Sequence, residues 1–245
     1  MPNEAPEPTH PHHVPGEPPA GTPPGAPDPA GDPFPGPLAP SLRVPVGLVV
    51  LVGPPASGKT SFVRALIARR QIDAAAVVSS DEIRAELFGS ASPAEAESDA
   101  ADARIFEERD RRIVARLAAG LTAIAESTNV TPRARARLVA LARRFDAPVT
   151  MLRFDPDVTD LLHRHAARNR SDLTAADVRA YAALMSRYAG ADRLRSEGAT
   201  TVHDVPGRLR ATTPAEAAAR FSFARRTPPP PGLSSRSGGG GRRGV

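Results

Sequence analysis

The stretch that most constrains this chain is residues 53–60, which read Gly-Pro-Pro-Ala-Ser-Gly-Lys-Thr. An apolar run at 46–52 precedes it, and a helical pattern at 61–69 follows it. A strand that leads into a glycine-rich turn and then a helix is the context in which G-x-x-x-x-G-K-[ST] binds phosphate. Gly53 and Gly58 let the backbone N–H groups point at phosphate oxygens, and the helix N-terminus adds partial positive charge. The pattern predicts a phosphate-binding loop; a plain flexible glycine turn is the alternative.

The residue following the second glycine of this loop is Lys59, which is the single lysine among 32 basic residues; the other 31 are arginines. A compact ammonium has therefore been kept where the motif requires one. Lys59 is predicted to reach the β- and γ-phosphates of ATP, and the Thr60 hydroxyl to coordinate Mg²⁺. The predicted nucleotide-binding residues are Gly53, Pro54, Pro55, Ala56, Ser57, Gly58, Lys59, Thr60 and Ser61.

Composition divides the 245 residues into a core and two tails. Residues 1–43 are proline-rich and almost free of aliphatic side chains, and residues 227–245 are rich in Pro, Gly and Arg. Such segments bury too little apolar surface to offset the entropy of ordering, so both are expected to be disordered. Between them we expect a domain at 44–207, then a short helix and connector at 208–226. The tails either engage protein partners or are solvated low-complexity segments.

Within the core, segments typical of strands alternate with segments typical of helices. Predicted strands occupy 46–52, 74–79, 121–126, 149–154 and 200–205. Predicted helices follow the loop, run from Ser80 to Gly89, and extend as one long helix from Pro93 to Gly120 that carries Phe106, Ile113 and Leu117 at helical spacing. Further helices are expected after Thr131, after Asp155 (which would cap it), from Thr174 to Tyr188, and from Thr213 to about Phe223. This alternation predicts the α/β P-loop NTPase fold, with a parallel sheet of about five strands and helices on both faces.

Several polar residues fall at the carboxyl ends of these strands, where open α/β sheets bind ligands. Asp81 and Arg84 are three apart on a helix and so share a face. Asp81 is predicted to accept the proton of an attacking hydroxyl, and Arg84 to hold an anionic acceptor. The alternatives are that Asp81 or Ser80 only caps the helix and that Arg84 is a solvated arginine. Glu126 has the position of a Walker-B acid that orients magnesium-bound water, or is a plain strand-terminal acid.

Two further groups leave alternatives open. Thr128 and Asn129 either contact phosphate or acceptor, or shape the turn that contains them. Arg164, Arg168 and Arg170 surround a polar break between two helices. An arginine-bearing lid there would stabilise charge during phosphoryl transfer and exclude water, and we assign that role to Arg168 and Arg170. A solvated arginine face is the alternative.

The bulk charge favours no particular partner. The formal net charge is +5, but residues 208–245 alone contain eight arginines and one glutamate. Basicity is thus mostly a property of the tail and argues only weakly for a nucleic-acid groove. The chain has no cysteine, which excludes disulfides and thiolate zinc sites, and no apolar run approaches the length of a membrane span. We therefore expect a cytoplasmic protein with no membrane association.

Residues 46–205 resemble the kinase domain of the polynucleotide 5′-hydroxyl kinase family. The matching pieces stand in order as GPPASGKT, SSDEIR, RLAAG, LTAIAESTNVTPRARARLVALAR and HAARNRSD. The resemblance implies ATP on the loop, an aspartate base at Asp81, an acceptor-phosphate arginine at Arg84, and lid arginines at Arg168 or Arg170. It also implies an RNA or DNA 5′-hydroxyl as acceptor.

The chain departs from that family at Glu126, where an aspartate is usual, and in a shorter lid segment. Zeta-toxin-like and small-molecule kinases share the same layout of loop and aspartate. The alternatives are therefore a kinase of small molecules, nucleotides or nucleotide sugars, and an ATPase or nucleotide switch without an acceptor.

Overall fold

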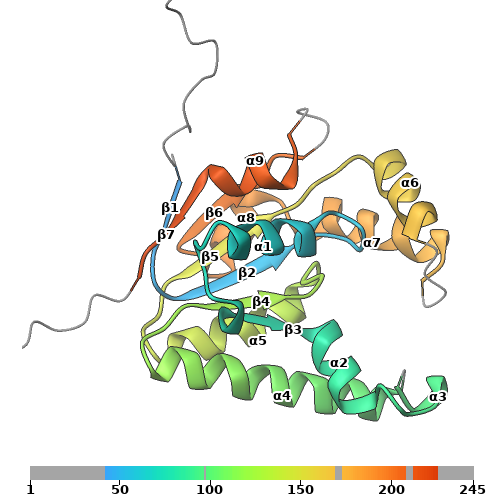
Figure 1. Cartoon of the computed structure of the whole chain (residues 1–245), viewed down its shortest axis with the longest axis horizontal. Coiled ribbons are helices and arrows are strands. Elements are labelled where there is room, and N and C mark those ends of the chain that lie inside the picture. Colours follow the sequence, from blue (N-terminus) through green and yellow to red (C-terminus); the bar gives the residue numbers. More distant parts are fainter. Residues whose placement is uncertain (1–41, 97, 169–172, 208–211, 226–245) are drawn as a thin grey trace, which may run out of the picture. The chain divides into compact units, whose positions relative to one another are not determined.

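The computed structural model describes residues 42–96, 98–168, 173–207 and 212–225 (Figure 1). The expectations of disorder for residues 1–41 and 227–245 lie outside these described residues. In chain order the elements are β1 (Leu42–Val44), β2 (Leu48–Val52), α1 (Lys59–Ala68), η1 (Ala74–Ala76), β3 (Val77–Ser79), α2 (Ser80–Phe88), α3 (Pro93–Ala96), α4 (Asp99–Ala118), β4 (Ala123–Glu126), α5 (Pro132–Arg143), β5 (Val149–Arg153), α6 (Val158–Arg168), α7 (Ala175–Tyr188), α8 (Ala191–Ser196), β6 (Thr201–Asp204), α9 (Pro214–Ala219) and β7 (Phe221–Phe223).

The centre of the fold is a five-stranded sheet in the order β3-β4-β2-β5-β6. All four strand pairings are parallel. Every residue of β2 is buried, as expected for a central strand of a parallel sheet that is covered on both faces. The predicted α/β P-loop fold, with its five parallel strands and flanking helices, is confirmed.

Alternate residues of β2 point to opposite faces of the sheet, and each face has its own hydrophobic core. Leu48, Val50 and Val52 pack in a core that α4, α5, α7 and α8 complete. Val49 and Leu51 pack in a second core together with side chains of α1 and α9. The loop after β2 is thereby held between two packed layers.

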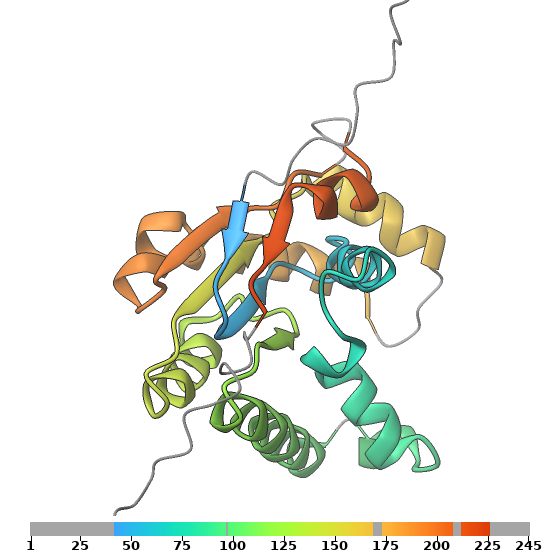
Figure 2. The same cartoon turned by 60° about the vertical axis from the view of Figure 1, so that its left-hand side comes forward.

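A second, two-stranded sheet joins segments from both ends of the described chain. β1 pairs with β7 in parallel, with Leu42 opposite Phe221 and Val44 opposite Phe223 (Figure 2). The sequence predicted a tail through residue 43 and a helix to about Phe223, and both predictions are wrong here. Phe221 is fully buried and packs edge-to-face on Phe62 of α1, with ring centroids 5.4 Å apart. A three-residue strand is too short to show periodicity, so only this packing identifies it.

Three other elements, and the exposure of one side chain, differ from the expectation. Residues 74–76 form the 3-10 helix η1 rather than the start of a strand. The long helix predicted from Pro93 is divided, because the Ser98 hydroxyl accepts the Ala101 N–H at 3.1 Å and starts α4 anew. The short helix α8 was not predicted. Phe106 is 37% exposed, because the buried stripe of α4 runs through Ile105 and Arg109 instead.

Among the helices of the described ranges, none is both long and apolar enough to cross a membrane.

We predict that acidification destabilises the fold through His203 on β6. Burial lowers the pKa of His203 below 6.5, Arg195 lowers it further, and Asp204 opposes both. The unfolded chain therefore binds the proton on His203 more readily than the folded protein does. The contribution of His203 to the free energy of unfolding is fully present above pH 6.5 and is lost as the pH falls below that value. His203→Phe should remove about 0.5 kcal/mol of this loss, a modest value because the ring is only partly buried. Urea unfolding on both sides of that pH measures it.

The control for this prediction is His165→Phe on α6. A His203→Phe protein that loses as much stability on acidification as the unchanged protein would contradict the assignment.

Candidate active site

The glycine-rich loop lies at the carboxyl end of β2, between β4 on one side and β5 on the other. The connection after β2 leads to β3 on one side of β2, whereas the connection after β4 leads to β5 on the other side, so the end of β2 lies at the switch point where open α/β sheets bind ligands. A Cβ at Gly53 would lie 2.7 Å from the Phe154 carbonyl oxygen, so only glycine fits against the end of β5. Gly58 has φ +100°, a left-handed conformation that glycine adopts without strain.

Helix α1 begins immediately after Gly58, and its N-terminus is open to an anion. Gly58 has no side chain to cap the first N–H groups, and the first turn of α1 contains no acidic residue. The N–H groups of this first turn and its partial positive charge suit a phosphate. The phosphate-binding role of residues 53–61 stays a prediction.

The Lys59 side chain reaches back into the loop and is hydrogen-bonded there. Its Nζ donates to the carbonyl oxygens of Gly53 at 2.8 Å and Pro54 at 2.7 Å, and to Ser57 Oγ at 3.2 Å. The side chain is only 9% exposed. The ammonium group is therefore held within the loop by three hydrogen bonds.

Thr60 and Glu126 bring the loop and the end of β4 together. The Thr60 hydroxyl donates to Glu126 Oε1 at 2.6 Å, and Glu126 is 8% exposed. Burial raises the pKa of the Glu126 carboxyl; Thr60 and Lys59 lower it, and the nearby carboxylates of Glu82 and Asp81 raise it. The hydroxyl and carboxylate are hard oxygen donors of the kind that Mg²⁺ prefers.

Within the described ranges there is no group of three or more His, Cys, Asp or Glu side chains that could hold a metal ion. Mg²⁺ usually needs only one or two protein ligands when it is bound together with nucleotide phosphates. Thr60 and Glu126 fit such a site.

We predict that Glu126→Gln stabilises the free protein but weakens its use of magnesium. Because the folded-state pKa lies above 4.5, the free energy of unfolding falls as the pH rises through it and the buried carboxylate ionises. A neutral amide should restore up to about 1 kcal/mol near neutral pH, and about 2–4 °C in Tm. Mg²⁺-dependent ATP binding should weaken by about 10- to 100-fold.

Thermal unfolding and nucleotide titrations at several Mg²⁺ concentrations measure both effects of Glu126→Gln. The gain in stability should vanish below pH 4.5, where Glu126 is protonated in either state. A variant that is less stable at neutral pH, or that binds Mg-ATP normally, would contradict this prediction.

The turn after Glu126 is locked to β2 and to the loop. The Asn129 amide donates to the Leu51 carbonyl oxygen at 2.9 Å, and the Gly53 N–H donates to the Thr128 carbonyl oxygen at 2.9 Å. Asn129 is 2% exposed and has φ 46°. Of the two roles left open for Asn129, these contacts favour the shaping of the turn.

Helix α2 carries Asp81 in its first turn. Ser79 caps this helix by accepting the Glu82 N–H at 3.4 Å, so neither Ser80 nor Asp81 is the cap. Asp81 is exposed and close enough to Glu126 to affect its pKa. The predicted base and the predicted metal ligand therefore lie in one neighbourhood.

Arg84 is engaged within the protein. Its guanidinium donates to the Asp102 carboxylate and to the Ala96 carbonyl oxygen, and so ties α2 to α3 and α4. The structure does not place this arginine free beside Asp81 for an acceptor phosphate.

The predicted lid is only partly described. Arg168 is the last residue of α6, its side-chain position is not described, and Arg170 lies outside the described residues.

Arg164, which was not assigned to the site from the sequence, lies over the loop. Its Nη1 is 3.5 Å from the carbonyl oxygens of Ala56 and Ser57, and its Nη2 bonds Asp160 at 2.5 Å. In the sequence, the spacing of four residues between Asp160 and Arg164 was the one signal that these two side chains would pair on a helix.

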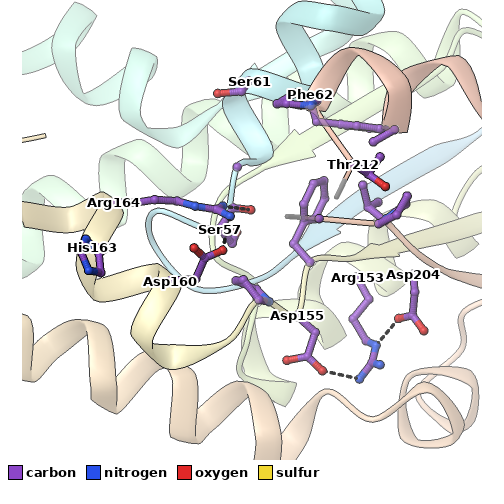
Figure 3. Close-up of a pocket in the computed structure, with 18 of the residues that line it drawn as sticks. Ser57, Ser61, Phe62, Arg153, Asp155, Asp160, His163, Arg164, Asp204 and Thr212 are labelled. Atoms are coloured by element: carbon purple, nitrogen blue, oxygen red, sulfur yellow. Dashed lines mark hydrogen bonds and ion pairs between the residues drawn. The ribbon is translucent and has the colours of Figure 1, made fainter. Parts of the chain in front are cut away.

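A cavity of about 660 Å³ opens beside the loop (Figure 3). Its walls come from the loop and α1, the end of β5, α6, and the segments around β6 and α9. Asp155 is in this lining, where it lies 3.4 Å from Arg153, and the cap predicted for it falls to Asp157, which accepts the Thr159 N–H at 2.7 Å. Lys59 and Glu126 do not line the cavity.

A parallel sheet, a glycine-rich loop at its switch point and an open helix N-terminus define the class: a P-loop, ATP-binding domain of the kinase type. The family model described as an AAA domain, AAA_33, matches residues 48–190. The chain belongs to this AAA_33 family. No curated protein matches it.

Solved structures with a similar fold include the Pnkp1/Rnl/Hen1 RNA repair complex, at 23% identity and TM-score 0.50, covering 60% of this chain and 44% of that one. Another Pnkp1/Rnl/Hen1 complex is 26% identical with TM-score 0.42, covering 54% and 40%. Shikimate kinase from Acinetobacter baumannii in complex with shikimate is 18% identical with TM-score 0.44, covering 71% and 89%. The chain spans less than half the length of the first two, and the first likeness shows the fold alone.

Proposed function

We propose that this protein transfers the γ-phosphoryl group of ATP to a hydroxyl group. The observation that carries the proposal is the cluster at the carboxyl edge of the sheet. Lys59 and Thr60 lie at the open N-terminus of α1, Glu126 is hydrogen-bonded to Thr60, and Asp81 is within electrostatic reach of Glu126. These groups could stabilise the charge of phosphoryl transfer and accept a proton.

In the proposed reaction the acceptor oxygen forms a bond to the γ-phosphorus, and the bond from that phosphorus to the bridging oxygen breaks, releasing ADP. Asp81 takes the hydroxyl proton. Lys59 neutralises charge on the β- and γ-phosphates. Mg²⁺, held by Thr60 and through water by Glu126, would neutralise charge on the same phosphates when bound. Arg164 lies on the loop and, with Arg168 and Arg170, would complete the cationic lid.

The 660 Å³ cavity suits the nucleoside part of ATP. It begins at Ser57, Gly58 and Ser61, so a base placed there keeps its phosphates at the N-terminus of α1. Its size and mixed apolar and polar lining are typical of small-ligand sites.

For the acceptor we propose an RNA or DNA 5′-hydroxyl. The support is the resemblance of the whole run of motifs to polynucleotide 5′-hydroxyl kinases, from GPPASGKT to HAARNRSD. A solved relative of the fold is part of an RNA repair complex.

A small-molecule hydroxyl is the second candidate acceptor, and one observation favours it. Arg84, the residue expected to hold the acceptor phosphate, is paired with Asp102. A polyanionic acceptor would have to displace Asp102 or use other cations, whereas a neutral hydroxyl compound would not.

The test incubates the protein with γ-labelled ATP, Mg²⁺ and 5′-hydroxyl oligonucleotides of RNA or DNA, beside a panel of small hydroxyl compounds. Label on an oligonucleotide end, with binding that weakens steeply with salt, supports the first acceptor. Label on a small compound supports the second. ATP hydrolysis without label on any acceptor would refute the kinase proposal and favour an ATPase or switch.

A further inference from the structure

Arg135 on α5 is the largest fully buried side chain among the described residues, with 0% exposure. A buried guanidinium is costly unless every donor finds a partner, and an apolar side chain would fill the same space at lower cost. Its neighbours in the sequence, Arg133 and Arg137, are exposed. The burial of Arg135 therefore needs an explanation in terms of what it holds.

The guanidinium of Arg135 joins three separate parts of the chain. Its Nε and Nη2 bind the Glu197 carboxylate at 2.6 and 2.8 Å. Nη2 also donates to the Tyr188 carbonyl oxygen at 2.8 Å, and Nη1 to the Asn129 carbonyl oxygen at 3.0 Å. Arginine suits this arrangement because its planar fork bonds a carboxylate and backbone carbonyls at once, which lysine cannot do.

The Asn129 contact leads directly into the candidate active site. Asn129 belongs to the turn after β4 that is hydrogen-bonded to Leu51 of β2 and to Gly53 of the loop. The same turn follows Glu126, whose carboxylate accepts the Thr60 hydroxyl. The Asn129 carbonyl and the Glu126 carboxylate therefore belong to one short segment that is hydrogen-bonded to β2 and to the loop and its helix.

The Tyr188 contact leads to the helices beside the loop. Tyr188 is the last residue of α7, and α7 packs on α6, the helix whose Arg164 lies on the loop. Glu197 follows α8 and is also bonded by Arg193 at 3.2 Å. Arg135 thus links the C-terminal end of α7, the helix that packs on α6, to the turn that follows Glu126.

We infer that Arg135 is a positioning residue: together with Glu197 it fixes the Asn129 turn, and through that turn the placement of Glu126 beside Thr60. The inference rests on the proposed function for its effect on rate. Its effects on nucleotide binding and on backbone protection do not depend on which acceptor is used.

The test uses the double variant Arg135→Met/Glu197→Met, because replacing both members of a buried pair with apolar groups usually preserves folding. The Mg²⁺ concentration for half-maximal binding of a fluorescent ATP analogue should rise about tenfold, and phosphoryl transfer should fall about 10- to 100-fold. Hydrogen exchange at the Gly53 N–H, which bonds the Thr128 carbonyl, should accelerate by about tenfold or more.

The matched control is Arg137→Met, two residues along the same helix, where the arginine is 51% exposed and paired with Asp110. It should leave all three readouts unchanged. A merely structural role for Arg135 predicts that the folded double variant binds Mg-nucleotide and protects Gly53 normally, and that result would overturn the inference.

If the double variant does not fold, Glu197→Gln takes its place, because it keeps the shape of the side chain and removes only its charge. Smaller changes in the same direction support the inference, and unchanged Mg²⁺ dependence and Gly53 exchange refute it. If the unchanged protein transfers no phosphoryl group, the proposed function fails, while nucleotide binding and exchange still decide the role of Arg135.

Discussion

Lys59→Met is expected to reduce phosphoryl transfer from ATP by at least about a thousandfold. Lys59 is the single lysine of the chain, and its ammonium group is already held at the loop by Gly53, Pro54 and Ser57. Without it, the developing charge on the transferred group loses a preorganised cation, and the loop loses its internal cross-link. The first loss acts on the transition state, and the second on the placement of the loop.

Lys59→Arg should fail almost as completely. The site is only 9% exposed and is shaped around a compact ammonium, and the guanidinium is wider and planar. Charge alone is therefore not expected to restore transfer.

Single-turnover transfer of labelled phosphate, with calorimetric ATP binding and thermal unfolding alongside, measures these effects. Arg64→Met is the matched control, since Arg64 lies on the same helix and is exposed. Retention of more than about a tenth of the activity in Lys59→Met would show that the lysine is not the main cation of the site.

Asp81→Asn is expected to lower the transfer rate by about 100- to 10,000-fold and to leave ATP affinity nearly unchanged. The amide keeps the size of the side chain but cannot take the proton of the acceptor hydroxyl. Because Asp81 is exposed on the first turn of α2, the substitution should not disturb the core. The expected signature is a fall in kcat with little change in the KM for ATP.

Glu82→Gln is a sharp control for this prediction. Glu82 is the next residue of the same turn, is also exposed, and raises the pKa of Glu126 together with Asp81. It therefore removes a similar electrostatic influence without removing the proposed base. Equal losses in the two variants would point to the field at Glu126, and near-normal turnover in Asp81→Asn would make the assignment of the base wrong.

The sequence by itself determined the features that depend on neighbouring residues. The loop at 53–60 is contiguous, and the order of chain segments around it follows from apolar runs and helix caps. Most of the order of strands and helices could therefore be read in advance, as could the positions of Thr60 at the start of the helix after the loop and of Glu126 at the end of a strand. Their hydrogen bond at 2.6 Å follows from two parallel strands being adjacent.

Only the tertiary structure decided which arginines form ion pairs or hydrogen bonds, and with which partners. Arg133, Arg135 and Arg137 alternate in the sequence with no local sign to distinguish them, yet Arg135 alone is buried, against Glu197 far along the chain. Likewise Arg84 is bound by Asp102, and Arg164 lies on the loop. The short β1–β7 pair depends on the packing of the Phe221 ring against the Phe62 ring of α1. The physical reason is common to all: an ion pair or aromatic contact depends on distance in space, which helix and strand periodicity do not record.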